Sequence, residues 1–140
     1  MGIKRQGASL GRQVLLVEEQ MVPMLLAEDA LLAAGYRVAT AASFHGTTRA
    51  MTTCMAEVAV LDLDLADQSS ILLADELTEL GVPIIFASAR SDFALPQRFA
   101  HVRVLGKPYR ASELVAGVNS LLGLETVTPA GAAEATPQMA

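Results

Sequence analysis

Short apolar runs that end in acidic residues constrain the fold of this chain more than any other feature. Residues 14–17 are all apolar and are followed by Glu18 and Glu19, and residues 58–61 are all apolar and are followed by Asp62. A run of this length bounded by polar residues is typical of a strand buried on both faces. Such strands occur in parallel sheets that are covered by helices on both sides, so we expect an α/β fold.

Similar runs recur along the chain and alternate with helical patterns, which gives five strands and five intervening or flanking helices, one of them poor. Short connections and right-handed crossovers then favour a flavodoxin-like, doubly wound parallel five-stranded sheet with strand order 2-1-3-4-5. The expected strands are 13–17, 36–41, 58–62, 83–87 and 101–105. The expected helices are 22–34, one capped by Ser43 that runs to about residue 55, one capped by Ser69 or Ser70 that runs to residue 80, and a last one that Ser112 caps or joins and that Gly123 ends. A loop or short broken helix is expected at 91–99.

The chain is long enough for one domain with a substantial core, and we place that domain at 13–123. Residues 1–12 lack periodicity and are expected to form a flexible leader. Residues 124–140 are rich in Ala, Thr, Pro and Gly and are expected to form a disordered tail.

The net charge and the hydropathy of the chain limit the kinds of partner and the cellular compartment that are expected. The net charge of −5 argues against nucleic acid or an anionic membrane as a partner through bulk charge. No apolar run approaches the roughly 20 residues that span a bilayer, and no signal-type apolar segment follows the amino end. Cys54 is the only cysteine, which suits a reducing compartment, so a cytoplasmic location is expected.

Parallel strands present their carboxyl ends at one edge of the sheet, where ligands bind in open α/β folds. In the expected order Glu18, Glu19 and Asp62 meet there, Ser88 ends the fourth strand and Lys107 follows the fifth. Clustered carboxylates repel one another unless a cation neutralises them, and Mg²⁺ prefers such oxygen ligands. A metal ion, an ammonium and a hydroxyl together suit a transferring phosphoryl group, with Asp62 as the nucleophile.

These residues resemble the receiver domain of two-component response regulators, and the likeness runs from about residue 13 to residue 122. The resemblance implies that Asp62 accepts a phosphoryl group from a histidine kinase or a phosphotransfer protein, and that Ser88 and Lys107 sense it. The segment 86–89 further resembles the Phe-Ala-Thr-Gly of the single-domain FAT-GUY class. The matching motifs are 14–19 for the acidic pair, 60–62 for the phosphoacceptor strand, 87–88 for the hydroxyl, and 107–109 for the Lys-Pro-aromatic turn.

The same resemblance implies a magnesium site. Glu19 and Asp62 would bind Mg²⁺ together with the backbone carbonyl of Asp64, and Glu18 would act through water. Asp64 is expected to be a loop residue whose side chain does not bind the metal ion.

The sequence departs from the receiver pattern at several positions. Glu19 stands where Asp is usual, Ala89 replaces Gly after the hydroxyl, and Val104 replaces the usual aromatic residue of the fifth strand. A proline is common four residues after the phosphoacceptor, where this chain has Ala66.

Three functions are consistent with these residues. The first is a single-domain response regulator, not an enzyme beyond possible self-dephosphorylation, that signals by contacting a downstream protein. The second is a phosphorylation-independent interaction module with a degenerate metal site. The third is a phosphatase, because Asp62 and Asp64 resemble the Asp-x-Asp of haloacid-dehalogenase-type enzymes; the Gly-Thr pair that follows that motif is missing here.

The expected first helix is apolar around nearly its whole circumference, broken only by Glu28 and Asp29. A surface helix normally has a single apolar stripe, so its outer side is predicted to bind another protein, most simply a second copy in a homodimer. The alternative is an alanine-rich surface without a partner.

Overall fold

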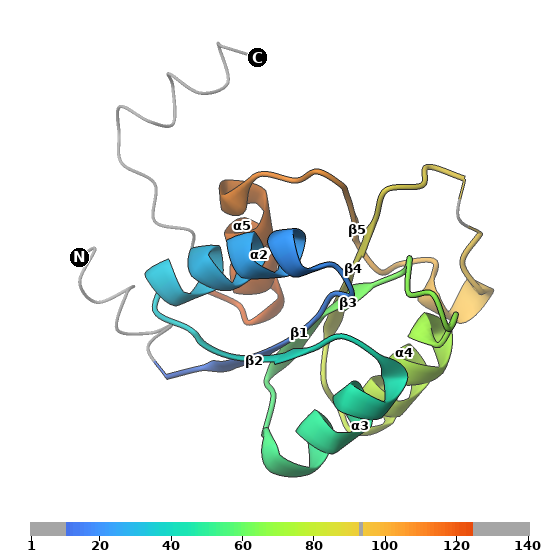
Figure 1. Cartoon of the computed structure of the whole chain (residues 1–140), viewed down its shortest axis with the longest axis horizontal. Helices are drawn as coiled ribbons and strands as arrows, with labels where there is room; N and C mark the ends of the chain where they lie inside the picture. The colour runs from blue at the N-terminus through green and yellow to red at the C-terminus, as the bar shows by residue number, and fades with distance from the viewer. Residues whose placement is uncertain (1–10, 93, 125–140) are drawn as a thin grey trace.

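The computed structural model describes residues 11–92 and 94–124, which form a five-stranded parallel sheet between two layers of helices (Figure 1). The strand order is β2-β1-β3-β4-β5. This confirms the predicted fold class and strand order. The strands are β1 Gln13–Val17, β2 Arg37–Ala41, β3 Val58–Asp62, β4 Ile84–Ser88 and β5 Val104–Gly106.

The helices divide between the two faces of the sheet. Helices α2 (Met21–Ala33) and α5 (Ala111–Leu121) lie side by side on one face, and α3 (Phe44–Thr53) and α4 (Ser70–Glu79) lie on the other (Figure 1). Side chains of β1 alternate between these layers: Val14 and Leu16 pack in the cluster with α2 and α5, whereas Leu15 and Val17 pack in the cluster with α4. Both faces of the sheet are therefore covered, which explains why β1 and β3 are continuous apolar runs.

The register brings the carboxyl ends of the three central strands and β5 level with one another. Val17 pairs with Leu61, Asp62 pairs with Ala87, and Ser88 pairs with Gly106. The residues that follow these pairs, including Glu18 and Lys107, consequently emerge at the same edge of the sheet.

Several predicted helix boundaries agree with the structure to within two residues. Gly35 follows α2 with φ +97, as expected for the glycine that closes a helix. The Ser43 hydroxyl accepts a hydrogen bond from the Gly46 amide at 3.0 Å and caps α3.

The last third of the domain differs from the prediction. The expected strand at 101–105 is shorter and later, since β5 comprises only three residues from Val104. Between β4 and β5 the described residues contain one turn of 3₁₀ helix, η1 (Gln97–Phe99), which agrees with the loop or short broken helix expected at 91–99. Arg110 caps α5, so Ser112 joins the helix and does not cap it, and Glu113 accepts a hydrogen bond from the Arg110 amide at 2.7 Å.

The predicted leader and tail lie outside the described residues except at their inner ends. Gly11 and Arg12 belong to the folded part: the Gly11 amide donates to the Gly35 carbonyl, and Arg12 pairs with Glu57 at 2.6 Å. No helix in the described ranges is long and apolar enough to cross a membrane.

Candidate functional site

Lys107 lies at the centre of the acidic edge of the sheet. Its Nζ is 2.9 Å from Asp62 Oδ1, 3.0 Å from Glu18 Oε1 and 3.8 Å from Asp64 Oδ2. Asp62 and Glu18 are each only 2% exposed. The backbone also fixes the lysine, because the Lys107 amide donates to the Ser88 carbonyl at 2.8 Å and ties the end of β5 to the end of β4.

The electrostatics of this cluster keep the lysine charged. Burial by itself would lower the pKa of Lys107, but hydrogen bonds to Asp62 and Glu18, together with their negative charges, outweigh burial and raise its pKa. One ammonium thus faces three carboxylates. The site keeps a net negative charge and attracts further cations.

The backbone of β3 and the loop after it hold the Asp62 side chain in place. Asp62 Oδ1 accepts a second hydrogen bond, from the Asp64 amide at 2.8 Å. The Ser70 hydroxyl, at the start of α4, donates to the Asp62 carbonyl oxygen at 2.6 Å. Ser70 was predicted only as a helix cap; its contact with the strand end depends on how α4 packs, which no sequence motif reveals.

Asp64 is the residue whose position differs most from expectation. Its carboxylate points into the site: Oδ1 accepts a hydrogen bond from the Ser88 hydroxyl at 2.8 Å, and Oδ2 accepts one from the Ala89 amide at 2.8 Å. Burial would raise the pKa of Asp64, but these two hydrogen bonds and the charges of Lys107 and Arg90 hold that pKa below its ordinary value. From the sequence, only the backbone carbonyl of Asp64 was expected to act in the site, and its side chain was expected to lie in the loop.

The two adjacent glutamates lie in different surroundings. Glu18 is the buried one and contacts Lys107, with Oε2 accepting from the Gln20 amide at 3.1 Å. Glu19 is exposed, and its Oε1 accepts a hydrogen bond from the Ala66 amide at 2.6 Å. A proline at position 66 could not make this bond, because proline has no amide hydrogen. The two departures at Glu19 and Ala66 are therefore complementary in the structure.

The predicted magnesium ligands contact protein groups in the structure. The described ranges contain no group of three or more His, Cys, Asp or Glu side chains arranged to hold a metal ion. Lys107 pairs with both Glu18 and Asp62, while Asp64 and Glu19 accept hydrogen bonds from backbone amides. The donor chemistry still suits Mg²⁺, which accepts one or two carboxylates and completes its shell with water.

Two other predicted positions lie around the cluster. Val104, in the place of the usual aromatic residue, is 41% exposed on the edge strand β5. Tyr109 is partly buried beside the cluster, and burial together with the charge of Glu18 raises the pKa of its phenol.

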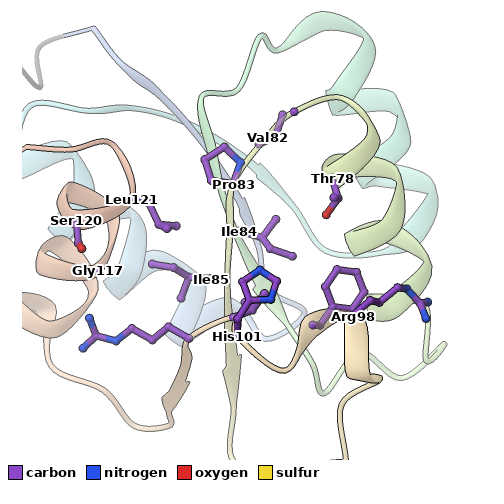
Figure 2. Close-up of a pocket in the computed structure, with 14 residues that line it drawn as sticks. Thr78, Val82, Pro83, Ile84, Ile85, Arg98, His101, Gly117, Ser120 and Leu121 are labelled. Carbon is purple, nitrogen blue, oxygen red and sulfur yellow. The ribbon is translucent and has the colours of Figure 1, made fainter.

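A separate pocket lies at the opposite end of the sheet (Figure 2). Pro83 and Ile84 line it at the start of β4, and His101 lines it ahead of β5. Arg98, also in the lining, pairs with Asp75 through two hydrogen bonds of 2.7 and 2.8 Å. The pocket contains none of the predicted site residues, so it is distinct from the acidic edge.

Comparison with solved structures identifies the class of fold. The chain has the fold of the CheY-like receiver domains of response regulators. It is similar to SdrG from Sphingomonas melonis Fr1, with 26% sequence identity and a TM-score of 0.67 over 80% of this chain and 97% of that one. It is similar to the PhyR response regulator receiver domain of Erythrobacter litoralis, with 25% identity and a TM-score of 0.68 over 88% and 99% of the two chains.

A third neighbour is a CheY-like receiver domain from Methylobacillus flagellatus, with 21% identity and a TM-score of 0.68 over 79% of this chain and 98% of that one. No family model and no curated protein matches the sequence.

Proposed function

We propose that this protein is a single-domain response regulator that accepts a phosphoryl group on Asp62 from a histidine kinase or a phosphotransfer protein. One observation carries the proposal: the Asp62 carboxylate stands at the buried end of the central strand, 2.9 Å from the Lys107 ammonium. An ammonium in that position stabilises negative charge that develops on a phosphoryl group. The receiver fold supports the same conclusion.

The chemistry is a displacement at phosphorus. Both hydrogen bonds described for the Asp62 carboxylate reach Oδ1, so Oδ2 is the oxygen assigned to the attack. A bond forms between Oδ2 and phosphorus while the bond from phosphorus to the donor's imidazole nitrogen breaks, and the electron pair leaves with the imidazole. Lys107 contacts the transferred group, and the Ser88 hydroxyl donates to one of its oxygens.

Magnesium completes the proposed site. Asp62, Glu18 and the backbone carbonyl of Asp64 are the groups that would hold Mg²⁺, in place of the Glu19 pairing expected from the resemblance. When bound, the ion would neutralise charge on the phosphoryl oxygens. Besides accepting the phosphoryl group, we propose only that the protein slowly removes this group from itself. We propose no turnover of an external substrate.

The test is phosphorylation by a small-molecule donor. Incubation with acetyl phosphate and Mg²⁺ is expected to add one hydroxylamine-sensitive phosphoryl group to the wild type, detected by intact-protein mass spectrometry. The Asp62→Ala variant should remain unlabelled, whereas Asp92→Asn, which changes an exposed aspartate, should be labelled like the wild type. Equal labelling of Asp62→Ala would overturn the assignment.

The second candidate is a phosphorylation-independent interaction module with a degenerate metal site. The observation that favours it is that the described carboxylates do not form a metal-binding group. A Mg²⁺ titration followed by amide chemical shifts separates the two functions. Saturable shifts at residues 62–64 support the phosphoacceptor, and no shift up to high millimolar Mg²⁺ supports the interaction module.

Output through protein contact is supported by the surface of α2. Five large apolar side chains of this helix are between 49% and 68% exposed. An apolar groove between α2 and the segment after β5 extends to Lys107 itself, so it adjoins the phosphoacceptor. The exposed side chains are Met21, Val22, Leu25, Leu26 and Leu32.

We propose that this face binds a downstream protein or a second copy of the chain, in the cytoplasm. Light scattering at rising protein concentration, with and without acetyl phosphate, tests the homodimer. A dimer that Leu26→Glu abolishes supports it. A monomer under all conditions removes the second copy and leaves the downstream protein as the occupant.

A further inference from the structure

The Asp64 carboxylate already occupies an anion-binding arrangement. A hydroxyl from the end of β4, the next backbone amide, and the ammonium after β5 converge on it: Ser88 Oγ at 2.8 Å, the Ala89 amide at 2.8 Å and Lys107 Nζ at 3.8 Å. The Ser88 side chain is buried, since the residue is only 2% exposed. Donors of these three kinds, two from the end of β4 and one from the residue after β5, are what an oxyanion requires.

The donors that hold Asp64 are those the proposed phosphoryl group needs. Lys107 Nζ links the two aspartates, since it lies 2.9 Å from Asp62 and 3.8 Å from Asp64. A phosphoryl group on Asp62 would therefore enter the space beside the Asp64 carboxylate. The Ser88 hydroxyl and the Ala89 amide each have one hydrogen to donate, so neither can satisfy both groups at full strength.

We propose that Asp64 is a built-in competitor for the phosphoryl group: its carboxylate holds the Ser88 and Ala89 donors in the unmodified protein and must leave them when Asp62 is modified. This inference rests on the proposed phosphoacceptor function and adds regulation of the same site. Two consequences follow. The negative charge of Asp64 and its hydrogen bonds weaken the binding of phosphoryl oxygens. In the unmodified protein, the loop that begins at Ala89 is already held by the hydrogen bond from the Ala89 amide to the Asp64 carboxylate.

The position of Asp64 in the chain explains why the competition is reversible. Its amide is bonded to Asp62 Oδ1, so the backbone stays fixed while the side chain can rotate. The side chain keeps 24% of its surface exposed, and water can take over its hydrogen bonds when it leaves.

The experiment compares binding of beryllofluoride, a phosphoryl analogue, to wild type, Asp64→Ala and Asp64→Asn at saturating Mg²⁺. Loss of the competitor is expected to tighten binding about tenfold, the effect of roughly one charge-assisted hydrogen bond. Asp92→Asn removes one exposed negative charge from the loop after β4 without touching the donors, and should bind like the wild type. Equal affinities for wild type and both Asp64 variants, or the same tightening in Asp92→Asn, would refute the competition.

A second measurement is independent of phosphoryl chemistry. The Ala89 amide resonance should shift upfield in Asp64→Ala without ligand, and in the wild type it should move as the Asp64 carboxyl is protonated at low pH. No response of this amide to either change would show that the contact is not formed in solution and would overturn the inference.

The two proposals fail in different ways. If acetyl phosphate labels Asp62 while removal of Asp64 has no effect on beryllofluoride affinity, the phosphoacceptor function stands and the competition is rejected. If neither the wild type nor the Asp64 variants bind beryllofluoride, both are rejected. Thermal unfolding of each variant, followed by circular dichroism, ensures that the compared proteins are folded.

Discussion

Replacement of Lys107 by methionine tests the electrostatic arrangement of the site through its effect on stability. Methionine keeps most of the length and the apolar stem of lysine but removes the charge. At an effective dielectric constant of about 20, each contact near 3 Å has a gross attraction of about 6 kcal/mol. Desolvation cancels much of this, and loss of one partner of a buried ion pair typically costs about 3–5 kcal/mol.

The expected cost is in that range because the two carboxylates left behind, Glu18 and Asp62, are each only 2% exposed. For a domain of this size a loss of about 3–5 kcal/mol lowers the melting temperature by roughly 10–20 °C. Thermal and urea unfolding at neutral pH, followed by circular dichroism at 222 nm, measures the loss.

Three further variants identify the cause of the stability loss in Lys107→Met. Lys107→Arg keeps the charge and should retain most of the stability, and Glu18→Gln in the Lys107→Met background should recover part of the loss. Arg98→Met removes the same charge from an exposed ion pair with Asp75 and should have a much smaller effect. If Lys107→Met were as stable as the wild type, the lysine would not be stabilising the buried carboxylates of Glu18 and Asp62, and the ion pairs would not contribute to stability in solution.

Three other predictions address single contacts elsewhere in the domain. Tyr36→Phe removes the hydroxyl that donates to the buried Asn119 side chain, and urea unfolding should show a loss of about 1–3 kcal/mol. Ser43→Ala removes the cap of α3 and should cost about 1 kcal/mol by the same measurement, whereas Ser43→Asp should cost less. The pKa of Asp64 is lowered in the folded state, so its ionised carboxylate stabilises the fold at pH values above the unfolded pKa of about 3.9. This contribution disappears as the pH falls through the lower pKa of the folded state. The stability difference between wild type and Asp64→Asn should therefore shrink with acid below about pH 4.

The sequence was sufficient to predict the sheet and the edge at which Asp62 and Lys107 meet. Apolar runs with acidic ends identify buried strands, and parallel strands deliver the residues after them to one edge. The bounds of the short β5 were not predictable in the same way, because β5 is an edge strand and two of its three residues, Val104 and Gly106, are exposed. A strand that is not buried on both faces does not form the continuous apolar run that marks the bounds of a central strand.

The directions of the side chains within the site could not be predicted from the sequence. Glu18 and Glu19 are adjacent and chemically identical, so no pattern says which of them turns inward; the Ala66 amide decides it by binding Glu19. Likewise, the sequence does not say whether Asp64 contributes its backbone carbonyl or its side-chain carboxylate to the site. The exposed amide of Ala89 and the Ser88 hydroxyl, both brought from another strand, settle the choice in favour of the carboxylate.

Two of the departures from the receiver pattern, Glu19 and Ala66, compensate each other. A site that had merely lost its function would be expected to leave buried polar groups without partners, yet within the described ranges every fully buried side-chain nitrogen and oxygen has a hydrogen-bond partner. The longer acid at Glu19 meets an amide that is present because position 66 is not proline. The Asp64 carboxylate meets the hydroxyl and amide that a phosphoryl group would use. Glu19 and Asp64 thus each have their own donors, which favours a rebuilt phosphoacceptor site over a degenerate one.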